Sequence, residues 1–429
     1  METKESVIRL MTRLAVEYRA INLAQGFTDE APFYELVWGG VSAIVGGTDD
    51  QVERLETLAL RQLIDQGEGA ADEVFNLTLK DLLARLQNRR DRFNQYSYPF
   101  GLPGLRQKIA DYTQRFYQFR PDPENEITVV LGATEGISTV LRALCEPGDG
   151  VVVLQPFHEM YPAQAAIFGL RPQYATLREN FARGTWELDR GELEEIVDDT
   201  TRVLILNSPH NPTGKVFSRD EMLFIAELCQ RRDLLLITDE IYEHIVYDGR
   251  RHYCPASFAG MQERTFVVNS ISKTGNATGW RIGWVLSPAA YTRRIRSIHD
   301  TLVIQAPTPL QKGAERLLGL GDEMYRELAR NYNRKRAVLM RALQRAGFRI
   351  SPPQGAYYLF ADYHQVAALR GRAPMEAARY LIEKVGVAPV PGDNFYQVGD
   401  EGERYLRFAF CRSIESLLEA GRRLERHLS

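Results

Sequence analysis

The sequence predicts an α/β protein whose larger part is a mostly parallel sheet covered by helices on both faces. Short apolar runs recur between positions 108 and 290, and amphipathic helical stretches separate them. Parallel strands that are buried on both faces have such unbroken apolar runs. The chain also has 429 residues, enough for two domains. In open sheets of this kind ligands bind at the carboxyl ends of the strands.

Six apolar runs are the expected strands of this sheet, at 127–131, 151–154, 203–206, 234–237, 265–269 and 284–286. Residues 132–136 form a turn, and the spacing after it predicts a helix that reaches Leu144. The capping box at 218–221 begins another helix. Beyond about residue 320 the pattern changes to a long charged helix at 324–346, a strand at 357–360, a helix near 375–385 and a last strand at 405–409.

The N-terminal part contains an expected helix at 6–20, followed by the extended segment INLAQGF at 21–27. Two further helices are expected within 34–92. The first has a cap at Thr48 or Asp49 and a stop at Gly67, with Val52, Leu55, Ala59 and Leu63 on one face. The second carries Leu79, Leu82, Leu83 and Leu86. This region is either a decorating hairpin or a lid or specificity wall over the pocket.

Composition excludes several classes of protein. The net charge is −3, so no basic excess indicates nucleic-acid binding. The uncharged runs are interrupted, and residues 1–5 lack the order of a signal peptide, which predicts a cytoplasmic protein without membrane spans. The cysteines are far apart, so we expect buried reduced thiols and neither a disulfide framework nor a metal cluster, at Cys145, Cys229, Cys254 and Cys411.

One lysine is the strongest chemical candidate. Lys273 lies in SISKTGNATGWRIGW at 270–284, between two apolar runs. Burial or a neighbouring cation such as Arg281 lowers a lysine pKa toward the neutral amine, which forms Schiff bases with aldehydes. The hydroxyls of Ser270 and Ser272 together with Arg281 suit a phosphate. A lysine in a Ser/Gly-rich loop is otherwise most often a solvated surface group.

The pattern SxSKxxxxTGWRxGW resembles the lysine segment of pyridoxal-phosphate enzymes of the class I/II aminotransferase family. INLAQGF and NQYSYPFGLPGLR at 94–106 look like segments of its kynurenine and methionine aminotransferase branch, and NSPHNPTG at 207–214 is similar to NPxNPTG, with Ser208 and His210 at variable positions. The resemblance covers 20–32 and 93–425. It implies fold type I, with an N-terminal segment 1–33, a helical insertion 34–92, a large domain 93–315 with a seven-stranded type of sheet, and a small C-terminal domain 316–429.

The resemblance implies a role for each part of a pyridoxal 5'-phosphate site. Lys273 is the amine, and Asp239 pairs with the ring nitrogen, while Tyr242 and Asn211 support the ring oxygen. The phosphate is bound by Ser270, Ser272, Arg281 and the backbone at the start of a helix, Gly132, Ala133 and Thr134. Tyr96 reaches the phosphate of a neighbouring subunit, which implies a homodimer with shared active sites.

The remaining implied roles concern the ring face and the substrate. His158 stands where the family usually has a Tyr or Phe stacked on the ring. Imidazole can stack, but it can also exchange protons, and both roles stay open. Arg407 matches the arginine that clamps the substrate α-carboxylate, with Arg412 as the competing candidate. The backbone of Gly26 and the side chain of Asn211 lie near the same carboxylate.

We therefore expect an aminotransferase that moves the amino group of an L-amino acid to a 2-oxo acid. No second substrate-binding arginine can be placed, so neutral, aromatic or thioether amino acids are favoured. One alternative is β- or γ-elimination or replacement, for example on S-adenosylmethionine or a cysteine conjugate, or amino-acid oxidation on the same fold. A second alternative is the effector domain of a transcription regulator, although the extra helices here follow INLAQGF instead of preceding the enzyme-like part.

Overall fold

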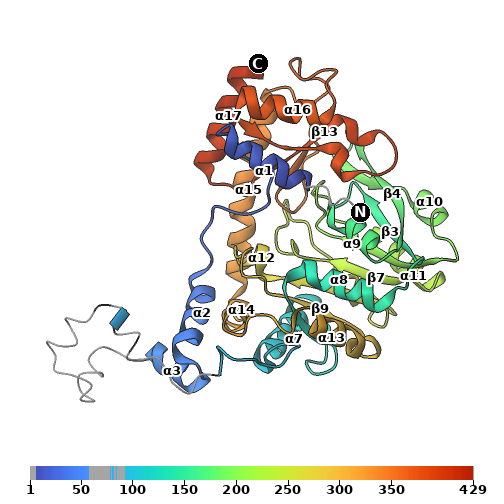
Figure 1. Cartoon of the computed structure of the whole chain (residues 1–429). Coiled ribbons are helices and arrows are strands. Elements are labelled where there is room, and N and C mark those ends of the chain that lie inside the picture. The colour runs from blue at the N-terminus through green and yellow to red at the C-terminus, as the bar shows by residue number, and fades with distance from the viewer. Residues whose placement is uncertain (1–5, 58–77, 79, 82–83, 85–91, 429) are drawn as a thin grey trace.

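The computed structural model describes residues 6–57, 78, 80–81, 84 and 92–428 (Figure 1). Its largest sheet has the strand order β2-β9-β8-β7-β6-β3-β4-β5. The strands β3, β4, β6, β7 and β8 run parallel to one another, whereas β9 is antiparallel to β8 and β2, and β5 is antiparallel to β4. Their bounds are β2 Ile127–Val130, β3 Gly150–Gln155, β4 Arg171–Asn180, β5 Thr185–Leu188, β6 Thr201–Asn207, β7 Leu235–Asp239, β8 Thr265–Ser270 and β9 Gly283–Leu286.

The six strands predicted for the sheet are present, which confirms the predicted α/β class. The sequence did not reveal β4 and β5, which form an antiparallel pair at one edge. Polar residues interrupt β4, and only three of its ten residues are fully buried, so the strand lacks the unbroken apolar run of a central strand. The turn predicted at 132–136 is instead the first part of a helix that begins at Gly132.

Helices cover both faces of the sheet, and alternate strand residues enter two separate cores. In β3, Val151 and Val153 pack in one core, whereas Val152 and Leu154 pack in the other. The helices around the sheet are α7 Pro103–Tyr117, α8 Gly132–Leu144, α9 Met160–Ile167, α10 Arg190–Glu195, α11 Arg219–Arg231, α12 Ile271–Thr274, α13 Ala289–Val303 and α14 Thr308–Leu318, with a 3₁₀ turn at Pro255–Ser257. The capping box predicted at Ser218 and Glu221 begins α11.

The C-terminal part has its own small antiparallel sheet with the order β10-β13-β12. Its strands are β10 Tyr358–Asp362, β12 Val390–Pro391 and β13 Tyr405–Ala409. The helices are α15 Asp322–Arg345, α16 Pro374–Tyr380 and α17 Ile414–Leu428. A π-helical turn at Leu381–Val385 and 3₁₀ turns at Gly392–Phe395 and Glu401–Arg404 complete it.

The start of the described chain packs against this C-terminal part. Helix α1, Val7–Glu17, lies in the same part of the molecule as α17 in Figure 1, and Met11, Leu14 and Ala15 are buried on its inner face. Strand β1, Ile21–Asn22, pairs in parallel with β11, Val387–Ala388. The pairing fixes the segment that follows β1, and that segment enters the pocket described below.

Two helices follow the N-terminal segment. Helix α2, Tyr34–Gly46, packs closely on α14. The two backbones are so near that a Cβ at Gly39 would lie 2.9 Å from the Cα of Gly313. Helix α3, Asp49–Thr57, begins at the predicted cap. The other residues predicted for this helical region, Ala59, Leu63, Gly67, Leu79, Leu82, Leu83 and Leu86, lie outside the described residues.

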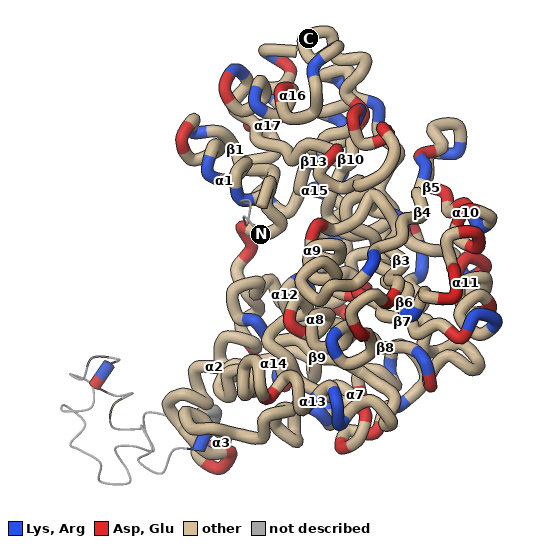
Figure 2. The backbone as a smooth tube through the Cα atoms, turned by 45° about the vertical axis from the view of Figure 1, so that its right-hand side comes forward, with Lys and Arg blue, Asp and Glu red and all other residues tan. Residues whose placement is uncertain are grey.

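Charged residues of both signs are interspersed along the described chain (Figure 2). Within that part of the chain, none of the helices combines the length and apolar character needed to cross a membrane. All four cysteines are buried and unpaired.

Candidate active site

A pocket of about 360 Å³ lies at the carboxyl ends of β7 and β8. Asp239 ends β7 and Ser270 ends β8, so adjacent parallel strands deliver both residues to the same edge of the sheet. The C-terminal part contributes Tyr358 from β10 and Arg407 from β13. The segment after β1 contributes Gln25 and Gly26. The pocket is thus built from segments that are far apart in the sequence.

Lys273 enters this pocket from the short helix α12, where the hydroxyl of Ser270 accepts a hydrogen bond from the backbone N–H of Ser272. Its Nζ donates a hydrogen bond of 2.9 Å to the carbonyl oxygen of Gly26. Burial lowers the pKa of Lys273 to about 8, and the positive charge of Arg281 acts in the same direction. A larger fraction of the amine is therefore neutral near physiological pH than for an exposed lysine, as a nucleophile requires.

Arg281 lies at one end of the pocket and has a left-handed backbone, with φ of 57°. Its Nη1 donates to the carbonyl oxygen of Thr278 at 2.9 Å. Gly132 does not line the pocket but leaves room for this guanidinium, because a Cβ at Gly132 would collide with it. The first residues of α8, Ala133 and Thr134, also line this end of the pocket.

The same end has the donors that a phosphate requires. A guanidinium, two serine hydroxyls from Ser270 and Ser272, and the N-terminus of the thirteen-residue helix α8 surround it. The helix dipole and free backbone N–H groups favour an anion at this position. The residues present therefore fit the phosphate group of pyridoxal phosphate.

Asp239 is a buried carboxylate on the pocket wall. Its Oδ2 accepts a hydrogen bond of 2.8 Å from the hydroxyl of Tyr161. Burial raises the pKa of Asp239 to about 6. A protonated ring nitrogen would supply the opposite charge that a buried carboxylate needs, so Asp239 fits the pyridine ring of the cofactor. Tyr161 was not singled out in the sequence, although it lies only three residues beyond His158.

His158 lines the pocket, and its Nδ1 accepts a hydrogen bond of 3.2 Å from the backbone N–H of Met160. Burial, with the charges of Arg407 and Lys273, lowers the pKa of His158 to about 3. The imidazole is therefore neutral at physiological pH. Since Nδ1 accepts, the ring proton lies on Nε2.

Tyr242 and Asn211 occupy neighbouring positions. The hydroxyl of Tyr242 forms a hydrogen bond of 3.1 Å with that of Tyr358, and both residues line the pocket. Asn211 is buried behind the pocket wall, where its Oδ1 accepts a hydrogen bond of 3.0 Å from Nη1 of Arg407. Its backbone N–H donates to Oδ1 of Asn207 at 2.7 Å. Asn211 therefore orients Arg407 in this structure.

Arg407 is buried and lines the pocket. Besides Asn211, it donates from Nη2 to the carbonyl oxygen of Ala24 at 2.7 Å. Its Nε is buried and has no hydrogen-bond partner. Leaving a buried charged donor unpaired costs free energy, so this arginine is suited to bind a carboxylate in the pocket.

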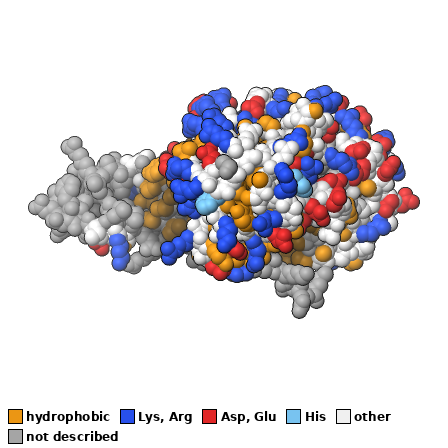
Figure 3. All heavy atoms as spheres, turned by 90° about the horizontal axis from the view of Figure 1, so that it is seen from above, with side chains coloured by type: hydrophobic (Ala, Val, Ile, Leu, Met, Phe, Trp, Pro, Cys, Tyr) orange, Lys and Arg blue, Asp and Glu red, His pale blue; other side chains and the backbone are white. Residues whose placement is uncertain are grey.

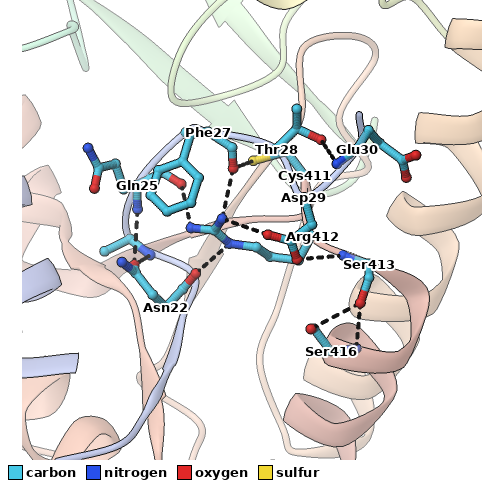
Figure 4. Close-up of polar contacts among 12 residues, drawn as sticks. Asn22, Gln25, Phe27, Thr28, Asp29, Glu30, Cys411, Arg412, Ser413 and Ser416 are labelled. Carbon is cyan, nitrogen blue, oxygen red and sulfur yellow. Dashed lines mark hydrogen bonds and ion pairs between the residues drawn. The ribbon is translucent and has the colours of Figure 1, made fainter. Parts of the chain in front are cut away.

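Arg412 uses its donors differently (Figure 4). It donates to the carbonyl oxygens of Asn22 at 2.8 Å and Phe27 at 2.9 Å, and it pairs with Asp29 at 3.1 Å. These bonds hold the INLAQGF segment against the end of β13. Of the two arginines, Arg407 is the one in the pocket.

Gly26 and Tyr96 complete the set of predicted residues. A Cβ at Gly26 would collide with the hydroxyl of Tyr358, and the Gly26 carbonyl also accepts from Tyr357 at 2.7 Å. Tyr96 is 79% exposed and does not line the pocket. The structure thus brings eleven predicted residues to one pocket, namely Gly26, Ala133, Thr134, His158, Asp239, Tyr242, Ser270, Ser272, Lys273, Arg281 and Arg407.

Several pocket residues were not predicted. Helix α1 brings Ser6, Ile8 and Arg9 to the pocket, and Glu159 and Met160 lie beside His158. The sequence predicted helix α1 only as an amphipathic helix. Such a pattern does not show whether the polar face of the helix contacts bulk solvent or lines a pocket.

One buried cluster of possible metal ligands lies outside the pocket, at Glu240, Glu243 and His252. Its oxygen atoms already have protein partners. Glu243 accepts from Tyr112, Tyr117 and Asn269, and Glu240 accepts from Thr238 and pairs with His252. The cluster is therefore a hydrogen-bonded network between α7 and the strands β7 and β8.

The fold and the pocket together define a pyridoxal-phosphate-dependent enzyme. The cofactor requires an amine, an anion site, an acid at the ring nitrogen and a flat group against the ring, and Lys273, Arg281, Asp239 and His158 fit these requirements.

Comparison with known proteins identifies the family. Residues 65–424 match the model of the class I and II aminotransferases. The chain is 32% identical over 351 residues to human kynurenine–oxoglutarate transaminase 1, which covers 76% of this chain and 83% of the relative. It resembles the structure of N-succinyldiaminopimelate aminotransferase from Mycobacterium tuberculosis with a TM-score of 0.83 and 32% identity, over 98% of this chain and 97% of that one. An Escherichia coli structure described as having a methionine aminotransferase function gives a TM-score of 0.81 and 27% identity, over 99% and 97%.

The chain belongs to the class I and II aminotransferase family. It is a pyridoxal-phosphate-dependent transferase of fold type I that transfers amino groups. The resemblance found in the motifs is confirmed.

Proposed function

We propose that the amino donor is a neutral, aromatic or thioether L-amino acid and that the acceptor is a 2-oxo acid. The observation that carries this proposal is the position of Arg407, with an unpaired buried Nε, in the same pocket as Lys273. Ile8, Met160 and Ile241 give the pocket an apolar wall for the donor side chain. Relatives named for kynurenine and methionine support the same substrate class.

In this proposal the residues of the chain have separate tasks. Pyridoxal phosphate, when bound, would supply an electron sink for the α-carbon of the substrate. Arg407 holds the α-carboxylate, and Asn211 orients Arg407. The neutral amine of Lys273 would take the proton from the α-carbon of the substrate. It would then donate a proton to the cofactor carbon, as transfer of the amino group requires. Asp239 would provide the negative charge for the ring nitrogen, and the neutral imidazole of His158 would supply the flat group for the ring face.

Amino-group transfer is better supported than elimination, replacement or oxidation. The residues that hold the α-carboxylate and take the α-proton serve all of these reactions. The relatives, however, are named as transaminases or aminotransferases, and no described residue specifically favours the alternatives.

An absorption experiment tests this function. Methionine, kynurenine or phenylalanine added to the purified holoenzyme is expected to convert the visible absorption of the bound cofactor to that of its pyridoxamine form, and 2-oxoglutarate is expected to restore it. The 2-oxo acid products are identified by mass spectrometry. Release of ammonia, or formation of hydrogen peroxide, without the pyridoxamine form would contradict the proposal.

We also propose that the protein is a homodimer in which Tyr96 reaches the phosphate of the neighbouring subunit. An exposed apolar surface surrounds Tyr96. Its large members are Tyr34 at 72% exposure, Tyr96 at 79%, Tyr98 at 58%, Leu302 at 57%, and Ile44 and Ile304 at 46% and 47%.

Two hydrogen bonds bring parts of this surface together. Asn94 donates to the carbonyl oxygen of Ile44 at 3.1 Å, and the N–H of Ser97 donates to Gln305 at 2.7 Å. Figure 3 shows hydrophobic side chains together on the side of the molecule where α2 lies. Such a surface supports burial between subunits.

Sedimentation equilibrium tests the dimer. We expect a mass near twice the 48.9 kDa of one chain at micromolar concentration. Conversion of Tyr34 and Ile44 to aspartate is expected to shift the protein toward monomers, because a charge inside an apolar interface is desolvated without a partner. A wild-type protein that sediments as a monomer would contradict the proposal.

The division into 1–33, 34–92, 93–315 and 316–429 remains our proposal for the domains. The pairing of β1 with β11 supports assigning the first segment to the small domain. Because α2 packs on α14, we place the first part of the segment 34–92 against the large domain. Four buried, unpaired cysteines support a reducing compartment such as the cytoplasm.

A further inference from the structure

The charges that line the pocket do not all have an assigned partner. The cations are Arg9, Lys273, Arg281 and Arg407, and the anions are Glu159 and Asp239. In the proposed function the cofactor accounts for Lys273, Arg281 and Asp239, and the substrate α-carboxylate accounts for Arg407. Arg9 and Glu159 remain.

Glu159 is already held by the protein. It accepts a hydrogen bond from the hydroxyl of Ser6, and its Oε2 accepts one of 3.0 Å from Nδ2 of Asn394. Both carboxylate oxygens therefore have donors. Glu159 joins the start of α1 to the loop that contains Asn394.

Arg9 differs from the other cations of the pocket. It lies on α1, three residues after Ser6, with an exposed side chain. Within the described part of the chain it has no hydrogen bond and no ion pair. Its backbone is nevertheless well fixed, because Met11, Leu14 and Ala15 are buried and Ser6 is bonded to Glu159. The structure thus presents an uncommitted guanidinium from a fixed helix at a pocket that already contains a carboxylate-binding arginine.

We propose that Arg9 binds the second carboxylate of a dicarboxylic substrate, namely a 2-oxo dicarboxylic acid as amino acceptor and the amino acid formed from it. This inference rests on the proposed function. A guanidinium binds a carboxylate through two parallel hydrogen bonds, which suits the distal end of such a substrate. A neutral donor side chain instead packs on Ile8, Met160 and Ile241, and Arg9 then stays in water at little cost because it is exposed. One pocket therefore accepts both kinds of substrate.

Replacement of Arg9 by glutamine tests this assignment. The ratio of kcat/KM for 2-oxoglutarate to kcat/KM for pyruvate is expected to fall roughly twofold to fivefold, because a solvent-exposed carboxylate contact is worth a modest free energy. The effect should shrink at high salt, since an exposed ion pair is screened. Arg13→Gln is the matched control, because Arg13 is an exposed arginine of the same helix that does not line the pocket. Arg9→Lys should restore part of the ratio.

A binding measurement makes the test independent of turnover. Calorimetry of the holoenzyme with glutarate and with pentanoate compares two ligands that differ mainly in the distal carboxylate. Arg9→Gln is expected to remove most of the preference for glutarate. The role of Arg9 would be overturned if the variant kept both the preference for glutarate and the ratio of kcat/KM values. It would also be overturned if affinity fell equally for both ligands and kcat/KM fell equally for both 2-oxo acids. If the wild type performs no transamination, the proposed function fails, whereas the calorimetry still decides the role of Arg9.

Discussion

Replacement of Lys273 by alanine is expected to remove the visible absorption of the bound cofactor and to lower kcat for amino-group transfer by at least about 10⁴-fold. Lys273 is the only lysine that lines the pocket of the described chain. Its pKa, lowered to about 8 by burial, suits both of the roles proposed for it, the amine for the cofactor aldehyde and the base for the α-proton. Loss of one side chain therefore removes two functions at once.

Borohydride reduction gives this expectation a direct measurement. Reduction of the wild-type holoenzyme should add the mass of the cofactor to the peptide that contains Lys273, and the alanine variant should show no such addition. Lys384→Ala is the control, because Lys384 is an exposed lysine outside the pocket. Cofactor mass on another lysine of the wild type would refute the assignment.

The sequence revealed those parts of the site that lie in compact motifs. Asp239 and Lys273 lie at or just after the ends of two neighbouring parallel strands, whose carboxyl ends meet at one edge of the sheet, whereas Arg407 interrupts an apolar strand of the small antiparallel sheet. The sequence did not show which of Arg407 and Arg412 is the candidate carboxylate-binding arginine. Both arginines belong to the same short segment, and only their partners show that one has an unpaired donor while the other holds backbone carbonyls.

Other parts of the site could not be predicted because their local pattern is ordinary. Arg9 lies on the polar face of an amphipathic helix, where an arginine is normally solvated. Tyr358 belongs to a buried strand, and its contact with Tyr242 joins positions 116 residues apart. Strand β4 was missed for a related reason, since a half-exposed strand with polar residues has no apolar run.

Asp239→Asn is expected to have opposite effects on stability and activity. Burial raises the pKa of Asp239 from 3.8 to about 6, so the folded cofactor-free protein retains a proton that the unfolded chain has lost. Its free energy of unfolding should consequently fall as the pH rises from about 4 to about 6. At about 1.4 kcal/mol for each pH unit, the ionised carboxylate costs about 3 kcal/mol at pH 7. Asparagine, which has nearly the same shape and can still accept from Tyr161, should regain much of this free energy.

The same substitution is expected to reduce kcat by at least about 10³-fold, because a neutral amide cannot supply the charge opposite the ring nitrogen while electrons accumulate there. Urea unfolding of the cofactor-free protein between pH 4 and pH 8 measures the first effect, and single-turnover absorption measures the second. Asp199→Asn, an exposed substitution outside the pocket, is the control for both. An asparagine variant within tenfold of wild-type activity would show that Asp239 is not the partner of the ring. A variant less stable than the wild type at pH 7 would show that protein groups alone stabilise the buried, ionised carboxylate. The cofactor would then not be needed to offset the free energy of burying it.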